Sequence, residues 1–155
     1  MVEAPKITYP GRVPLETELI HELQDEQFLN PHEMETLTIL CDLILPPSEE
    51  FKGASDADVV SFIEFMSKDE ETLQPDLRGG IMWLDHKSNT EYGTEFKSAT
   101  VEQQKEILDQ IAYYDPEIPS SERPFEVNFF SLVRNLTMTG FYTSKIGIEE
   151  IGYKG

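Results

Sequence analysis

Apolar residues recur along this chain at intervals of three and four positions, which is the period of an amphipathic helix. The clearest helix starts after Asn30, a residue type that caps helix N-termini, with Pro31 at its first position. Apolar residues from Leu37 to Ile44 share one face, and Pro46 cannot continue the helix. The pattern therefore predicts a helix that runs from Pro31 and stops before Pro46.

Two further helices are predicted in the middle of the chain. Ser55 and Asp58 have the spacing of a capping box, in which side chains at the first turn bond to each other's backbone N–H groups. A helix following this box and a third helix, which Gly79 and Gly80 are expected to loosen, complete this region. The residues predicted to face the core are Val59, Phe62, Ile63 and Met66 in the second helix, and Leu77, Ile81, Leu84 and Ser88 in the third.

The last two predicted helices follow the same pattern. Thr100 and Gln103 form a capping box for the fourth helix, which is expected to end near Asp115. The fifth begins around Pro124 and extends to Gly140. The residues predicted to face the core in the fourth helix are Val101, Ile107, Leu108 and Ile111, and the fifth helix carries Val127, Phe130, Val133, Arg134 and Met138.

No segment alternates apolar and polar residues as a strand does, so the predicted fold is all-α. We expect a single-domain bundle of about five helices, with an extended N-terminal arm and an irregular C-terminal tail. The arm covers residues 1–27, and the domain covers residues 28–155. A short amphipathic helix is predicted within the arm, over residues 15–26, from the spacing of Leu15, Leu19, Ile20 and Leu23.

Charge divides the chain unevenly. Of 30 acidic and 12 basic residues, which give a formal net charge of -18, residues 124–155 hold only three of each. This acidity argues against binding nucleic acid or anionic lipid, because both require Lys and Arg on the protein. The uncharged end is predicted to be buried against another polypeptide. The candidate interface residues are Phe141, Tyr142, Ile146, Ile148, Ile151 and Tyr153; the alternative is that this tail covers the domain's own core.

Motifs for chemistry are incomplete. His21 and His32 each begin a zinc-protease signature, but neither has a second histidine four positions later. The only cysteine, Cys41, lies in an apolar run and is predicted to be a buried, inert thiol. His86 beside Asp85 is the best candidate for a general acid or base, although no activated nucleophile accompanies it, and the alternative is a structural histidine that is partly exposed or hydrogen-bonded. The sequence therefore assigns no catalytic, cofactor-binding or metal-binding residue.

Several segments, taken in order, resemble one known family. They are Leu37–Pro46, Gly53–Ile63, Gly80–Asp85, Tyr92–Phe96, Gln103–Leu108, Phe129–Thr137 and Gly140–Ser144, followed by Gly152 and Tyr153. In order and spacing they resemble the small subunit of membrane-bound gluconate 2-dehydrogenase, the subunit 3 family. The resemblance extends over about residues 28–155.

The resemblance implies an accessory subunit that is not itself an enzyme and binds no cofactor. Such a subunit stabilises and matures a large flavoprotein of the glucose–methanol–choline type, which oxidises sugars or polyols in the periplasm, often with a cytochrome c subunit. Relatives that carry an export signal also escort the folded flavoprotein out of the cytoplasm. No export signal and no membrane span are visible in this sequence. Either the signal has been removed or this member stays in the cytoplasm.

Three other expectations remain open. A small enzyme using His86 would need a second titratable side chain within hydrogen-bond reach. A freestanding carbohydrate-binding module would show Trp83, Tyr113 and Tyr114 lining one groove. The isolated chain is also expected to form a homodimer if an apolar interface is left uncovered.

Overall fold

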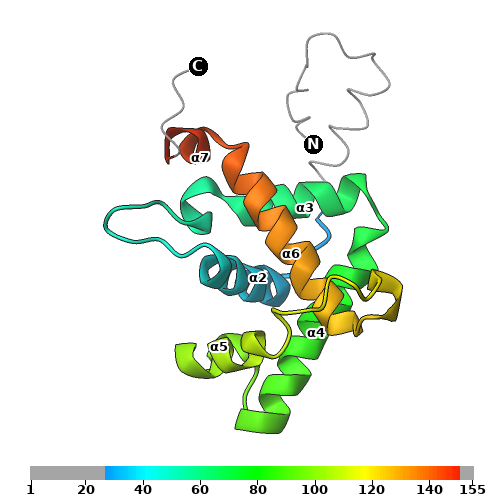
Figure 1. Cartoon of the computed structure of the whole chain (residues 1–155). Coiled ribbons are helices and arrows are strands. Elements are labelled where there is room, and N and C mark those ends of the chain that lie inside the picture. Colours follow the sequence, from blue (N-terminus) through cyan, green and yellow to red (C-terminus); the bar gives the residue numbers. More distant parts are fainter. Residues whose placement is uncertain (1–26, 151–155) are drawn as a thin grey trace, which may run out of the picture.

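The computed structural model describes residues 27–150, and this part of the chain contains helices and no strand (Figure 1). The predicted all-α fold is confirmed. The α-helices are α2 (Pro31–Ile44), α3 (Val59–Asp69), α4 (Leu73–Tyr92), α5 (Val101–Asp109), α6 (Phe125–Tyr142) and α7 (Lys145–Glu150). Short 3-10 helices are η1 (Ala54–Ala57), η2 (Phe96–Ser98) and η3 (Ser120–Glu122). The helix predicted over residues 15–26 lies outside the described residues.

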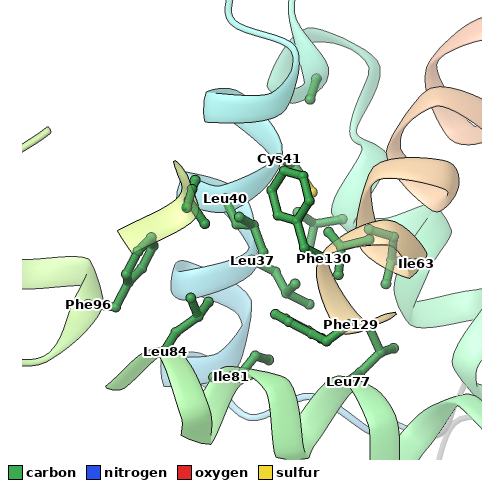
Figure 2. Close-up of a cluster of buried hydrophobic side chains, with 14 of the residues drawn as sticks. Leu37, Leu40, Cys41, Ile63, Leu77, Ile81, Leu84, Phe96, Phe129 and Phe130 are labelled. Carbon is green, nitrogen blue, oxygen red and sulfur yellow. The ribbon is translucent and has the colours of Figure 1, made fainter. Parts of the chain in front are cut away.

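Helix α6 organises the bundle. It crosses the front of the molecule diagonally and packs against α2, α3 and α4 (Figure 1). Figure 2 shows the core beneath this crossing, where Leu37 and Leu40 of α2 meet side chains from the other helices. The labelled residues from those elements are Ile63 of α3, Leu77, Ile81 and Leu84 of α4, Phe96 of η2, and Phe129 and Phe130 of α6.

The start of α2 follows the prediction. Asn30 accepts a hydrogen bond from the N–H of Glu33 at 2.8 Å, and the Glu33 carboxylate accepts one from the N–H of Asn30 at 2.9 Å. Thr100 and Gln103 form the same reciprocal pair at the start of α5. The predicted N-cap at Asn30 and the predicted capping box of Thr100 and Gln103 are therefore confirmed, and the bond from Asn30 N–H to Glu33 is an additional finding.

The capping box predicted from Ser55 and Asp58 is wrong. Asp58 has a left-handed backbone, with φ 52°, and its side chain does not cap α3. The Ser55 hydroxyl instead donates to the Asp42 carboxylate of α2. The turn η1 is closed by Asp56, whose carboxylate accepts the N–H of Gly53 at 2.7 Å. The chain thus makes a 3-10 turn before it enters α3.

Helix α4 is continuous through Gly79 and Gly80, so the predicted loosening is wrong. These glycines allow α6 to approach closely. A Cβ atom at Gly80 would lie 1.9 Å from Cδ1 of Phe129, and one at Gly79 would lie 3.1 Å from Cζ of Phe125. The predicted inward residues of this helix, Leu77, Ile81, Leu84 and Ser88, are all buried.

Three predictions at the ends of α5 and α6 need correction. Val101 is 52% exposed because it is the first residue of α5, at the end of the buried face. The same helix ends at Asp109 and not near Asp115, because tighter hydrogen bonds, including Ile111 N–H to the Leu108 carbonyl, close it. Helix α6 continues past Gly140 to Tyr142. In α3, Phe62 and Met66 were predicted to face the core and are only partly buried.

The tail after α6 is also more ordered than predicted. Residues 145–150 form the short helix α7, which packs back on α6. A Cβ atom at Gly147 would lie 1.8 Å from the Phe141 carbonyl oxygen, so only glycine fits this turn without a shift of the backbone. The part of the chain that the structure describes therefore holds six α-helices, one more than the five expected.

Candidate functional site

His86 does not form the predicted pair with its neighbour Asp85. It is exposed on α4, and within the described part of the chain it makes no hydrogen bond or ion pair. Asp85 binds His32 of α2, with 2.6 Å between Asp85 Oδ2 and His32 Nε2. The second titratable group that the His86 hypothesis required is therefore not found among residues 27–150.

His32 lies instead at a junction of three elements. Its Nδ1 atom is 3.7 Å from the Glu95 carboxylate, just before η2. The other carboxylate oxygen of Asp85 accepts the N–H of Phe96 at 3.1 Å. Lys97 adds an ion pair to Glu35 of α2 at 2.7 Å. This cluster connects the first turn of α2 to α4 and to the segment around η2, so its geometry serves packing.

Arg78 and Glu33 form a second cross-helix contact. The guanidinium donates to both carboxylate oxygens of Glu33, at 2.7 and 2.9 Å, and to the Phe28 carbonyl at 2.8 Å. It also stacks on the Phe28 ring, with 4.4 Å from Cζ to the ring centre. Hydrogen bonding to Arg78 lowers the pKa of Glu33. The buried carboxylate is therefore held in its charged form.

Glu64 of α3 holds the same segment from the other side. Its two carboxylate oxygens accept the N–H groups of Phe28, at 2.6 Å, and of Leu29, at 3.0 Å. Sequence reasoning identified neither Glu64 nor Arg78. Their partners lie 35 or more positions away along the chain, and no local pattern indicates such a pairing.

The prediction for Cys41 is confirmed. The thiol is 1% exposed, and Thr137 donates to its sulfur at 3.3 Å. Burial raises the pKa of Cys41 to about 11, so the thiol stays protonated at neutral pH and is a poor nucleophile.

Within residues 27–150, no group of three or more His, Cys, Asp and Glu side chains is arranged to hold a metal ion. No helix in this range is long and apolar enough to span a membrane. His21 lies outside the described residues.

The three aromatic residues expected of a carbohydrate-binding groove are separated. Trp83 is half-buried and packs against the core.

Tyr113 and Tyr114 are 79% and 38% exposed and line a cavity of about 300 Å³ with Ala112, Pro116 and Arg134. Trp83 does not line this cavity, so the predicted groove is not assembled.

The candidate interface residues lie in different environments. Phe141 is 2% exposed and belongs to the core, so it offers almost no surface to a partner. Tyr142 is 44% exposed and meets the Phe141 ring edge-on. Ile146 packs against the core and Ile148 is half-buried. Ile151 and Tyr153 lie outside the described residues. The tail thus covers part of its own domain, at least as far as Ile146.

These contacts define a small all-α domain in which the identified titratable pairs hold the domain's own elements together. The family described as Gluconate 2-dehydrogenase subunit 3 matches residues 31–155, and the chain belongs to this family. No curated protein and no solved structure matches the chain.

Proposed function

We propose that this protein is a non-catalytic accessory subunit that binds and stabilises a flavoprotein dehydrogenase of the glucose–methanol–choline type, acting on sugars or polyols. The observation that carries the proposal is the family match, which spans residues 31–155 and so includes nearly all of the folded domain. The family is named for a subunit of a dehydrogenase complex, and a subunit requires a partner chain.

The distribution of charge supports this role. The chain carries a formal net charge of -18, but its last 32 residues, 124–155, are balanced. An acidic body stays soluble, whereas an uncharged surface can be buried without the cost of removing charges from water. The polar contacts support the same reading, because His32, Glu33 and Glu64 each bind groups within the domain.

The proposed role also covers how the flavoprotein matures and where the complex works. The accessory subunit assists the flavoprotein to mature, and the complex works in the periplasm, with a cytochrome c subunit as a further partner. Export of the folded pair would explain why the flavoprotein needs a stabilising subunit before it leaves the cytoplasm. If this member stays in the cytoplasm, stabilisation alone is its role.

Co-expression tests the proposal. A flavoprotein dehydrogenase of the glucose–methanol–choline type from the same organism is produced with and without this chain, and flavin content and dehydrogenase activity are measured per mole of flavoprotein. We expect both to be several-fold higher with the chain present, and the two proteins to co-purify. Equal flavin content and activity in the two preparations, with no co-purification, would contradict the proposal.

A further inference from the structure

The outward side of α6 is a continuous stripe of uncharged residues. Phe125, Asn128, Leu132, Asn135, Thr139 and Tyr142 recur at intervals of three and four positions, and we call them the α6 outer face. Each is exposed or half-buried. In Figure 1, α6 lies across the front of the bundle, and none of the helices drawn in colour covers it from that side.

This face differs in charge from the rest of the protein. No Asp or Glu occurs from Val127 to Ile148, although the chain has 30 acidic residues. Acidic residues border the stripe at both ends, with Asp76 and Glu126 near its start and Glu149 near its end, while the basic residues Arg134 and Lys145 lie within the same segment. An uncharged centre with a charged rim is the usual anatomy of a protein interface.

A groove lies at the first turn of the stripe. It has a volume of about 240 Å³ and is lined by Leu73, Asp76, Phe125, Asn128, Phe129 and Leu132. This volume is below the roughly 300–1,000 Å³ of typical small-molecule sites, and it suits one anchoring side chain from a protein partner. The groove therefore extends the α6 outer face as a surface for a polypeptide.

The charge of the rim selects the occupant. A second copy of this chain also carries -18 and would be repelled. Residues 1–26 hold six acidic and two basic residues, so they too are poorly matched to an acidic rim. We infer that the α6 outer face binds the larger subunit of the dehydrogenase complex, through an apolar surface bordered by Lys and Arg. This inference rests on the proposed function.

The size of the stripe indicates that neighbouring surface takes part. An 18-residue helix is about 27 Å long at a rise of roughly 1.5 Å per residue. A single helix face of that length would bury less surface than the roughly 800 Å² that each partner buries in a stable interface. Tyr113, Tyr114 and Ile118 are exposed on the loop that leads to α6 and could enlarge the surface.

The test uses the full chain co-expressed with the flavoprotein of the co-expression experiment above. Asn135→Glu with Thr139→Glu places two carboxylates in the middle of the α6 outer face. Asn89→Glu with Thr90→Glu makes the same chemical change at exposed positions of α4 and serves as the control. We expect at least about a tenfold loss of co-purified flavoprotein for the first variant and none for the control, because an unpaired charge is costly to bury.

The outcomes separate the inference from the proposed function. If wild type and both variants retain the flavoprotein equally, the inference fails and the proposed function stands. If wild type itself does not bind, both fail. A photo-crosslinking residue at position 139 tests the surface without added charge: we expect an adduct with the flavoprotein. An adduct with a second copy or with residues 1–26 would overturn the inference.

Discussion

Gly80 and Phe129 lie in close contact where α4 packs against α6. Phe129 is 1% exposed and belongs to the core, so its ring is held by its neighbours. Phe125, which lies over Gly79, is 45% exposed and can swing toward solvent. Adjacent glycines on one helix therefore differ in how much a methyl group would disturb them.

We expect Gly80→Ala to destabilise the domain by about 2 kcal/mol, since strain from overpacking exceeds the gain in helix propensity of about 1 kcal/mol. Gly79→Ala is the matched control and should be neutral or stabilising. Urea denaturation of both variants measures the difference. Equal stability of the two variants would contradict the packing described at Gly80.

The ion pair between Glu33 and Arg78 predicts a dependence on pH. The pKa of Glu33 is lowered from 4.5 in the folded protein, so its stabilisation is present above the unfolded value and is lost as pH falls through the folded one. Because the Arg78 side chain is 45% exposed, we expect Glu33→Gln to cost only about 1–2 kcal/mol at neutral pH. Denaturation near about pH 3 should show a smaller difference from wild type. A difference that stays constant with pH would contradict the assignment.

The environment of Cys41 could be predicted from the sequence, whereas the partner of Asp85 could not. The inert Cys41 followed from its apolar neighbours, which also surround it in the fold. The partner of Asp85 was expected to be His86, yet it is His32, 53 positions away. Local sequence patterns indicate which residues are buried, but they do not indicate which polar side chains form contacts between helices that are distant in sequence.

At the scale of elements, helix starts were predicted best where the cap is a reciprocal pair. Asn30 and Thr100 each bond to a residue three positions later, a signal contained within four residues. The cap predicted from Ser55 and Asp58 was wrong because Asp58 has a left-handed backbone, which depends on the preceding turn η1. Helix α7 was missed because its packing on α6 requires the close contact at Gly147, which is a tertiary feature.

Removing the cap of α2 should have a defined cost. We expect Asn30→Ala to lower the free energy of unfolding by about 1 kcal/mol, because the N–H of Glu33 loses its acceptor. Asn30→Asp keeps an acceptor and should retain stability close to that of wild type. Thermal denaturation of the two variants measures this. If Asp is as destabilising as Ala, the cap does not act through that hydrogen bond.

At the scale of the whole molecule, the protein combines an acidic body with an uncharged helix face. The net charge of -18 opposes the approach of a second copy, and the α6 outer face lacks the charges that would oppose burial. Membership of the subunit 3 family indicates a subunit of a dehydrogenase complex. Together these features favour the proposed role, in which the domain binds another protein.

Sedimentation of the co-expressed pair, followed by the visible absorbance of flavin, tests this account most directly. We predict that the flavin sediments as one species heavier than the flavoprotein alone, and that this species contains the chain. Two separate boundaries, with the flavin in a species of the same size as the flavoprotein alone, would contradict it.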